Sequence, residues 1–574
     1  MEARLKLYIA ITATSIIGLV AVAVGAFSTA RLLLAALSLI LLGVFTYLLV
    51  RARVFTVDLL MAVAGLTTAY YGLVAEGLII LALYGFAEAS EEFIEEKAER
   101  SIESLVSGIR KKYLVEKGGS IEAIDTSSIR PGDVVIVRVG EMVPVDGAAA
   151  SSGVVDESLI TGEPVPVEIR PGMAVKSGAR VLEGPLRIMA LRSPSESYAQ
   201  KLAALARESL ESKPHIARLL EKMTPPITAS VIGLFAGLLA YIGPERALPV
   251  LLVGCPSAYI LSSSFLSSYT IALLARRGVL AKSSRPVEAL PLTDTVVMDK
   301  TGTLTALRVD PSQSRPPNGM SIEEFLGIIG DYALQSKHPV SRALHSYSRG
   351  KAVAVKEVRG KGLLGSGEYR VELSSGPPSE CGKTLLARIN GLEGLICLQE
   401  QLLPGARDLV EYLKSKGYYL IIASGDDEHN VARIAENLGV DEYYGSLRPE
   451  DKAGLIDELH AKGRRVVFIG DGLNDSIALS KADVGVGVGD LDAVQEVADI
   501  AVNGTPSQIL ALFGYGLRLR LSIASAFALA TIVKVIVGGL GILGALPLPI
   551  VAFLGDDGST LTGLAGGLIL LIKR

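Results

Sequence analysis

The sequence predicts a multi-domain membrane protein in which an eight-helix transmembrane bundle carries two large cytosolic parts. Hydrophobic residues make up 49% of the 574 residues and the mean hydropathy is +0.43, both high for a soluble protein. Long uncharged runs indicate several membrane spans. Between these runs lie one segment of short strands punctuated by glycine and one in which strands alternate with helices. The second pattern is typical of a parallel sheet covered by helices.

The eight spans are predicted from apolar runs long enough, or nearly long enough, to cross a bilayer. They are Leu7–Phe27, Leu32–Val50, Leu59–Ala75, Gly77–Ala87, about 223–243, about 247–275, about 521–545 and about 547–572. A Ser-Thr turn is expected after the first run, and a turn near Tyr70–Gly72 after the third. Lys and Arg gather at the ends expected to face the cytoplasm, at Arg4, Lys6, Arg51 and Arg53. The sequence thus predicts a multi-pass cell-membrane protein, surrounded by the lipid bilayer, with both termini and the soluble parts in the cytoplasm.

The charge balance and the cysteines say little about possible partners. The 56 basic and 60 acidic residues nearly balance, and we expect no nucleic-acid partner. The cysteines Cys255, Cys381 and Cys397 lack the spacing of a disulfide framework or zinc site, so the last two are expected to be ordinary cytosolic thiols. No Cys/His-rich segment precedes the first span, so regulation by an N-terminal metal domain is not expected.

The stretch Asp299–Thr305, Asp-Lys-Thr-Gly-Thr-Leu-Thr, is expected to carry the chemistry of the α/β part. It follows Thr295–Met298, a β-branched run that predicts a buried strand. A carboxylate at the carboxyl end of a parallel strand lies where α/β sheets bind ligands. Asp299 could attack a phosphoryl group and form an acyl phosphate, while Lys300 and Mg²⁺ offset the charge.

Further along, strands and helices alternate regularly. The prediction is helix Pro404–Lys416, strand Tyr419–Ala423, helix Glu428–Leu438, helix Glu450–Lys462, strand Arg465–Ile469, helix Asp475–Lys481 and strand Val484–Val488. Two of these strands end in polar motifs, Ser424-Gly425-Asp426 and Gly470–Asp475. In the first soluble segment, short strands are predicted at Val134–Val139, Val143–Val145 and Val154–Val155.

The membrane part contains reactive residues at similar depths. Pro256 removes a helix hydrogen bond and frees carbonyls, and Cys255 offers a soft thiolate ligand. Lys534 and Asp556 lie inside apolar runs, where charges are costly and usually functional. With turns near 245 and 546, all three lie roughly 15–18 Å into the bilayer, close to its middle. The sequence therefore predicts one shared ion site, whereas Glu76 lies close to a turn and near the outer face.

Together these motifs resemble P-type ATPases, the cation pumps that form an aspartyl-phosphate. Within that family the chain resembles the heavy-metal (CPx-type) branch, closest to its zinc/cadmium/lead exporters. The motifs that carry the resemblance are Phe55–Met61, Thr161-Gly162-Glu163, Cys255-Pro256, Asp299–Thr305, His338-Pro339, Gly470–Asp475, Lys534 and Gly555–Gly558.

The resemblance implies a division into domains. The expected parts are transmembrane helices 1–4 at 1–96, an all-β actuator domain at 97–210, transmembrane helices 5–6 at 211–280, a haloacid-dehalogenase-like phosphorylation domain at 281–306 and 395–515, an α+β nucleotide-binding insertion at 307–394, and transmembrane helices 7–8 at 516–574.

It also implies roles for residues of the cytosolic domains, with ATP as substrate and Mg²⁺ as cofactor. Mg²⁺ would be held by Asp299, Thr301 and Asp471, and ATP by His338, Pro339, Gly360 and Gly362. Glu163 would orient the water that hydrolyses the aspartyl-phosphate, a general-base role. The full predicted catalytic set is Asp299, Lys300, Thr301, Thr303, Thr161, Gly162, Glu163, Ser424, Gly425, Asp426, Lys452, Asn474 and Asp475.

In the membrane, the resemblance assigns ion binding to Asp556 and the role of an internal counter-cation to Lys534. The predicted transported-metal set is Cys255, Pro256, Ser257, Lys534, Asp556 and Glu76. Ser257 stands where the family usually has a second cysteine, so the site would hold one thiolate instead of two. Ala333 replaces a glutamate that contacts adenine in the family.

The sequence thus predicts ATP-driven export of a divalent heavy-metal cation, Zn²⁺ first and Cd²⁺ or Pb²⁺ next, by a monomeric pump. Two alternatives stay open. One is a copper(I)-exporting pump, for which a hard carboxylate such as Asp556 should matter little. The other is a membrane-tethered haloacid-dehalogenase-type phosphatase that uses Asp299 without transport.

Overall fold

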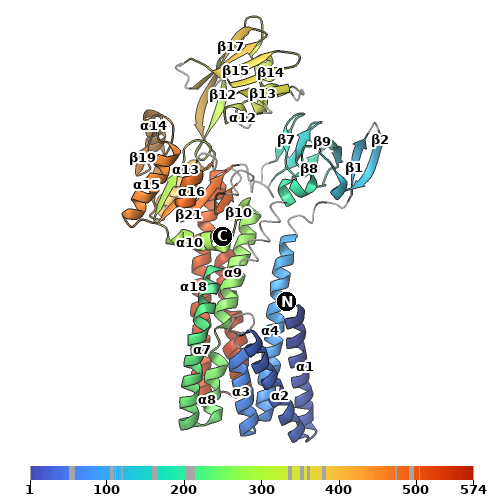
Figure 1. Cartoon of the computed structure of the whole chain (residues 1–574), viewed down its shortest axis with the longest axis vertical. Helices are drawn as coiled ribbons and strands as arrows, with labels where there is room; N and C mark the ends of the chain where they lie inside the picture. Colours follow the sequence, from blue (N-terminus) through green and yellow to red (C-terminus); the bar gives the residue numbers. More distant parts are fainter. Residues whose placement is uncertain are drawn as a thin grey trace.

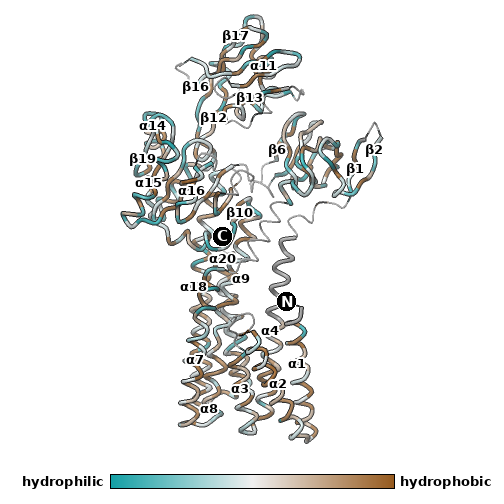
Figure 2. Tube along the Cα trace, viewed as in Figure 1, coloured by the Kyte–Doolittle hydropathy of each residue, from teal (hydrophilic) through white to brown (hydrophobic). Residues whose placement is uncertain are grey.

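The computed structural model describes residues 2–572 except 49, 51–57, 104–108, 110–111, 118–119, 158–165, 201–213, 334–335, 337–338, 350–353, 359–361, 378–382, 472–474, 490–496 and 503–504. A long helical bundle forms one end of the molecule, and three smaller bodies lie at the other (Figure 1). Hydrophobic residues dominate the bundle, whereas hydrophilic residues are frequent in the three bodies (Figure 2). This division fits a membrane-spanning bundle with soluble domains on one side.

The bundle contains helices from three parts of the chain. They are α1 Glu2–Ala23, α2 Phe27–Tyr47, α3 Asp58–Tyr71, α4 Val74–Glu103, α7 His215–Ile242, α8 Pro244–Val253, α9 Ser257–Ala275, α18 Pro506–Ile542, α19 Leu548–Ala552, the π-helical turn η6 Phe553–Gly558 and α20 Ser559–Ile572. Helix α1 packs against α4, and α18 packs against α9 and α20. The N-terminal helices thus form one side of the bundle and the later helices the other (Figure 1).

Within the described residues, five helical stretches are long and apolar enough to cross a membrane. They are Leu5–Ala23, Phe27–Tyr47, His215–Ile242, Pro244–Ala275 and Pro506–Ile542, and a shorter apolar helix spans Val74–Phe86. The count of eight spans stays a prediction.

One local expectation about the bundle is wrong, and the structure refines two others. The first turn lies at Gly25, whose φ of 81° favours glycine, so Ser28 and Thr29 are already inside α2. The fourth predicted span, Gly77–Ala87, agrees with the apolar part of α4, Val74–Phe86, and the helix continues without a break to Glu103. The sixth predicted span lies within the apolar stretch Pro244–Ala275, which is divided into two helices because the chain leaves helical geometry between Val253 and Ser257, where Pro256 has no N–H to donate.

The first soluble body is built from strands. They are β1 Lys112–Lys117, β2 Ser120–Asp125, β3 Val134–Val137, β4 Gly147–Ala149, β5 Gly153–Asp156, β6 Val167–Ile169, β7 Ala174–Val175, β8 Arg180–Glu183 and β9 Leu186–Ala190. A six-stranded sheet has the order β2-β1-β3-β9-β4-β7, and a three-stranded sheet has the order β6-β5-β8. The strand predicted at Val143–Val145 is wrong: both valines are buried, but the segment is a loop in which Pro144 lacks an N–H for a ladder.

The second body is an α/β sheet. Its strands are β10 Val279–Ala281, β11 Thr295–Met298, β18 Tyr419–Ala423, β19 Glu442–Tyr444, β20 Val466–Gly470, β21 Val484–Val488 and β22 Ile500–Val502, in the order β10-β22-β21-β20-β11-β18-β19. All neighbours are parallel except β10 and β22. The helices are α10 Ser284–Ala289, α13 Ala406–Ser415, α14 Glu428–Leu438, α15 Pro449–Ala461 and α16 Ser476–Lys481.

The centre of this sheet positions the candidate chemistry. Strand β11 lies between β18 and β20, and all residues of β11 and β20 are buried, as expected for strands covered on both faces. The carboxyl ends of these three parallel strands therefore meet at one edge. The predicted elements of this part are confirmed apart from small shifts at their ends, whereas β10, β19 and β22 were not predicted.

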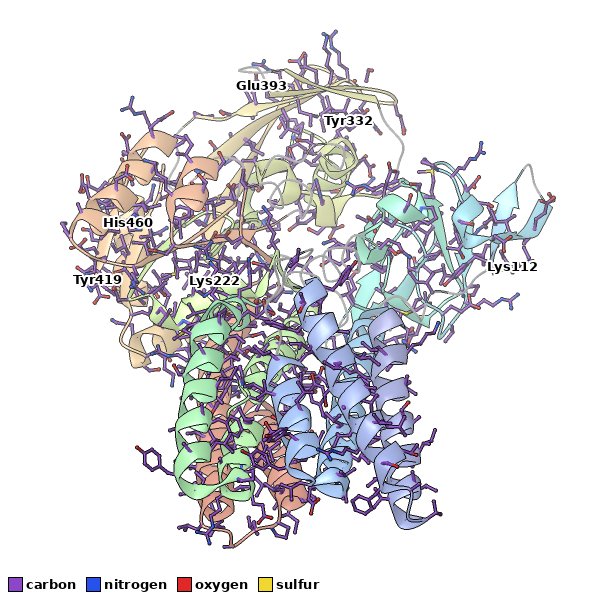
Figure 3. All side chains as sticks on the ribbon, turned by 60° about the horizontal axis from the view of Figure 1, so that its bottom comes forward. Lys112, Lys222, Tyr332, Glu393, Tyr419 and His460 are labelled. Carbon is purple, nitrogen blue, oxygen red and sulfur yellow. The ribbon has the colours of Figure 1, made fainter. Side chains whose placement is uncertain are left out.

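The third body is inserted between β11 and β18. Its antiparallel sheet has the order β12-β17-β16-β15-β14-β13, and the strands are β12 Thr305–Arg315, β13 Ala354–Val358, β14 Gly362–Ser366, β15 Val371–Ser375, β16 Lys383–Ile389 and β17 Leu392–Leu402. Helices α11 Ile322–Ala333 and α12 Pro339–Arg342 belong to this body. Tyr332, labelled in Figure 3, is buried in its core.

Strands β12 and β17 connect this insertion to the α/β sheet. Both run across the boundaries predicted at 306 and 394, so the division into domains stays a prediction. Cys397 on β17 is disulfide-bonded, which corrects the expectation of an ordinary thiol there. Cys381 lies outside the described residues.

Candidate functional site

Asp299 lies at the carboxyl end of β11, at the edge where three strands meet. Its side chain is buried, and its amide donates a hydrogen bond to the carbonyl of Ile469 over 2.7 Å. Lys452 Nζ, from α15, donates to Asp299 Oδ1 over 2.6 Å and to Asp475 Oδ1 over 2.7 Å. Two carboxylates from distant parts of the chain therefore share one buried ammonium.

Burial and charge set the protonation of this group. Burial raises the pKa of Asp299 to about 7, an effect that Lys452 opposes and that the carboxylates of Asp475 and Asp471 increase. Burial alone would lower the pKa of Lys452, but Asp299 and Asp475 outweigh it and raise that pKa. Lys452 therefore stays charged, and a further cation near Asp299 would favour its ionised form.

Lys300 forms its ion pairs with two carboxylates other than that of Asp299. It is buried, and its Nζ lies 2.5 Å from Glu400 Oε2 and 2.8 Å from Asp426 Oδ2. Thr301 Oγ1 donates to the same Asp426 oxygen over 2.9 Å. The two residues after Asp299 thus tie its loop to Asp426, whereas the lysine that contacts Asp299 directly is Lys452.

A cavity of about 300 Å³ joins these groups. Residues that the sequence marked as candidates line it together: Asp299, Thr301, Ser424, Gly425, Asp426, Lys452, Asp471 and Asp475. They come from the ends of β11, β18 and β20 and from α15. The carboxyl edge of the sheet thus forms one polar cavity around the proposed nucleophile.

The donors in this cavity fit Mg²⁺, which prefers oxygen ligands. Asp299 and Asp471 contribute carboxylates. The loop after Thr301 passes close to Asp471: a Cβ added to Gly302 would lie 3.9 Å from the Cβ of Asp471. The Thr301 hydroxyl is engaged with Asp426, so this residue would contribute its main-chain oxygen.

Several predicted residues cannot be compared with the structure. Thr161, Gly162, Glu163, His338, Gly360 and Asn474 lie outside the described residues. Pro339 begins α12, and Thr303 is buried beside the Asp299 loop. Gly362 begins β14 with φ of 94°, and a Cβ there would lie 1.8 Å from the carbonyl oxygen of Leu373. Gly362 is therefore required by the backbone, whatever it contributes to ATP binding.

The membrane site is a continuous set of polar contacts. Cys255 Sγ donates to Ser257 Oγ over 2.9 Å, and Ser257 Oγ donates to Asp556 Oδ1 over 2.9 Å. Cys255 and Pro256 form the break between α8 and α9, and Asp556 lies in the π-helical turn η6. A thiol, a hydroxyl and a carboxylate thus come together from two helices.

Lys534, on α18, completes this site. Its Nζ lies 3.3 Å from Asp556 Oδ1 and donates to the carbonyls of Cys255 over 3.0 Å and Val253 over 3.2 Å. These are carbonyls that the break at Pro256 leaves without helical partners. The three groups predicted to share one depth are therefore in one contact network. Glu76 is apart from it, in the first turn of α4 beside the turn at Gly72.

Sequence reasoning missed three polar residues. Glu400 on β17 bonds Lys300 and Thr305, and Lys383 on β16 bonds Asp426. Asp58, at the start of α3, is buried and accepts hydrogen bonds from Tyr84 over 2.8 Å and Tyr8 over 3.3 Å. A carboxylate directly before an apolar run was a signal for Asp58, but nothing local in the sequence distinguishes Glu400 or Lys383.

Comparisons with known proteins agree with this geometry. Residues 108–207 match the P-type ATPase actuator domain, and residues 293–483 match the haloacid dehalogenase-like hydrolases. A probable cobalt/nickel-exporting P-type ATPase of Mycolicibacterium smegmatis is 28% identical over 91% of this chain and 86% of its own length. The zinc/cadmium/lead-transporting P-type ATPase of Escherichia coli is also 28% identical, over 91% and 75%.

A copper-exporting pump and a solved structure are also similar to this chain. Copper-exporting P-type ATPase B of Archaeoglobus fulgidus is 30% identical over 72% of this chain and 65% of its own length. The crystal structure of a zinc-transporting PIB-type ATPase superposes with a TM-score of 0.55 at 26% identity and covers 99% of both chains.

The matching family models and relatives show an ATP-hydrolysing, ion-translocating enzyme of the P-type. The chain belongs to the P-type ATPases and, within them, to the heavy-metal (CPx-type) branch. It transports heavy-metal cations across a membrane, and P-type ATPases generally use ATP and Mg²⁺. This membership favours a pump over a tethered phosphatase.

Proposed function

We propose that the chain exports a divalent heavy-metal cation from the cytoplasm across the cell membrane, with Zn²⁺ as the first candidate and Cd²⁺ and Pb²⁺ as further cargoes. The observation that carries this proposal is the contact series Cys255–Ser257–Asp556 beside Lys534. One soft sulfur donor and two oxygen donors suit a borderline divalent cation.

In the cytosolic reaction, Asp299 is the nucleophile that accepts the γ-phosphoryl group of ATP. Its position at the strand end and its contact with Lys452 support this role. Mg²⁺, held by Asp299, Asp471 and the main chain at Thr301, would neutralise charge on the phosphates. Ser424 and Asp426, which line the same cavity, would bond the phosphoryl oxygens and hold the Asp299 loop.

The remaining cytosolic roles are proposed from the family motifs. Glu163 would orient the water that hydrolyses the aspartyl-phosphate, and Asn474 and Asp475 would complete the site around Lys452. His338, Pro339 and the Gly360–Gly362 turn would hold the nucleotide. We also propose the domain division predicted from the sequence, with eight membrane spans and both termini in the cytoplasm. The pump is proposed to be a monomer.

Coupling requires that phosphorylation of Asp299 changes the access to the membrane site. Lys534 already contacts Asp556 over 3.3 Å, which supports its proposed role as a built-in cation that takes the place of the exported ion. Rigid-body movement of the actuator and phosphorylation domains would drive the opening. Glu76, in the first turn of α4, is proposed as a contact on the exit path.

The test is metal-stimulated ATP hydrolysis by the purified full-length protein, measured with Zn²⁺, Cd²⁺, Pb²⁺, Co²⁺ and Cu(I). The expected result is stimulation by Zn²⁺, together with an acid-stable, hydroxylamine-labile phosphate from labelled ATP. Both should be absent in Asp299→Asn. Stimulation by Cu(I) alone would favour the copper pump, and hydrolysis indifferent to every metal would favour the phosphatase.

A further inference from the structure

A lysine of the insertion reaches the phosphorylation cavity of the α/β body. Lys383 begins β16, opposite Leu398 of β17 in the antiparallel register. Glu393, labelled in Figure 3, lies near the other end of this hairpin. Lys383 is therefore at the end of β16 where β17 continues to Glu400 and the α/β sheet. This position, far along the chain from Asp299, brings its side chain to the cavity.

The contacts of Asp426 show how closely the two bodies approach. Lys383 Nζ donates to Asp426 Oδ1 over 3.0 Å, whereas the other oxygen, Oδ2, accepts from Lys300 and Thr301. Burial opposes ionisation of Asp426, but the two lysines outweigh it and hold its pKa below the usual range. Asp426 is thus an anion held on one side by the insertion and on the other by the Asp299 loop.

The charges around the cavity single out Lys383. The cavity is lined by four carboxylates and two ammonium groups. The carboxylates are those of Asp299, Asp426, Asp471 and Asp475, and the ammonium groups are those of Lys383 and Lys452. Lys452 is buried and divided between two carboxylates. The Lys383 side chain is 55% exposed and has one carboxylate contact, so its ammonium keeps N–H donors directed away from Asp426.

We propose that Lys383 binds phosphate oxygens of ATP and supplies the insertion's cation at the phosphoryl group that moves to Asp299. The inference rests on the proposed role of Asp299 as acceptor. In the transfer, an Asp299 oxygen forms a bond to the γ-phosphorus while the bond to the β,γ-bridging oxygen breaks, and ADP leaves with that electron pair. Lys383 donates hydrogen bonds to the phosphates and neither gains nor loses a proton.

This role has a physical advantage over a passive tether. A phosphoryl group that enters a cavity lined by four carboxylates meets strong repulsion, and each added cation reduces it. Because Lys383 is attached to the insertion, its cation reaches the cavity only when the two bodies are close, as they are here. Closure of the insertion and charge neutralisation at Asp299 then happen together.

The test compares two routes to the same phosphoenzyme in full-length protein. Labelled ATP brings three phosphate groups to the cavity that Lys383 lines, whereas labelled inorganic phosphate brings only one. The variants are Lys383→Met, Lys383→Arg, and Lys356→Met as a control on the exposed face of β13 in the same sheet. We expect Lys383→Met to raise the ATP concentration for half-maximal phosphorylation about tenfold to a hundredfold. Phosphorylation from inorganic phosphate should be reduced less than phosphorylation from ATP, because only one phosphate group then meets the lysine. Lys383→Arg should restore most of the loss, and Lys356→Met should behave as the unmodified protein.

The other outcomes overturn the inference. Equal losses with ATP and with inorganic phosphate would mean that Lys383 acts only by holding Asp426. No change with either would mean that the ion pair is a surface contact without a role in phosphate binding. If the unmodified protein forms no phosphoenzyme by either route, the proposed function itself fails, and this is distinguishable because the variants are then no worse than their parent.

Discussion

The hydroxyl of Ser257 donates a hydrogen bond to Asp556 Oδ1 over 2.9 Å, and the same hydroxyl accepts one from the Cys255 thiol. The residue that replaces the family's second cysteine is therefore the link between the sulfur donor and the carboxylate. This placement makes Ser257 a candidate ligand of the transported metal, although it lacks the thiol of a cysteine. The hydroxyl and the carboxylate also make the donor set harder than a pair of thiolates.

Ser257→Cys should shift the metal preference toward softer ions. A second thiolate favours Cd²⁺ over Zn²⁺, and we expect the ratio of apparent affinities to change by about tenfold in favour of Cd²⁺. The measurement is ATP hydrolysis as a function of each free metal concentration. Ser230→Ala, on the exposed face of α7, serves as the control and should leave both curves in place. An unchanged ratio in Ser257→Cys would exclude Ser257 as a ligand position.

Lys452→Met should abolish phosphorylation and weaken the α/β domain. The substitution leaves the buried carboxylates of Asp299 and Asp475 without their shared ammonium, which costs about 3–5 kcal/mol when a buried pair is broken. Labelled phosphoenzyme and the thermal transition of the purified protein measure the two effects. Lys462→Met, just after the same helix and exposed, should change neither. A normal phosphoenzyme level in Lys452→Met would contradict the assigned role.

Much of the α/β domain could be predicted because its signals are local. Strand Thr295–Met298 is a short β-branched run and is found with the same bounds in β11. The tips of β18 and β20 were predicted to carry chemistry, and both line the cavity. Parallel strands bring their carboxyl ends together whatever the length of chain between them.

The partners of the lysines could not be predicted in the same way. Lys300 follows Asp299 directly, yet it contacts Glu400 and Asp426, while Lys452, from a separate helix, contacts Asp299. Successive residues after a strand leave it in different directions, so adjacency in sequence says little about which side chain faces the cavity. The depth argument for Cys255, Lys534 and Asp556 worked better, because a helix has a fixed rise per residue.

Binding of Mg²⁺ should depend on pH below about 7. Burial raises the pKa of Asp299 to about 7, so at lower pH the metal must displace a proton from this carboxyl. The apparent Mg²⁺ affinity should therefore rise with pH by at most about tenfold per unit and become flat above about 7. Equilibrium Mg²⁺ binding at pH 6, 7 and 8 would measure this: the apparent affinity should rise by up to about tenfold between pH 6 and 7 and little between pH 7 and 8. Asp299→Asn, which has no proton to release, should remove the slope, and a slope that persists in it would assign the proton to another group.

Asp556→Ala should separate a zinc pump from a copper(I) pump. The Asp556 carboxylate accepts from Ser257 and contacts Lys534, so its removal takes away an oxygen donor and leaves the Lys534 ammonium without its anionic contact. A divalent borderline cation uses such a donor, whereas Cu(I) is held by soft ligands, to which a carboxylate contributes little. We expect equilibrium Zn²⁺ binding to fall by at least about tenfold and Cu(I) binding to stay within about twofold. Asp556→Asn provides the matched control for size. It keeps an oxygen donor without the charge, so its Zn²⁺ affinity should lie between those of the unmodified protein and Asp556→Ala. A loss of Cu(I) binding as large as the loss of Zn²⁺ binding would mean that the variant disrupts the site as a whole, and the carboxylate would then no longer distinguish the two cargoes.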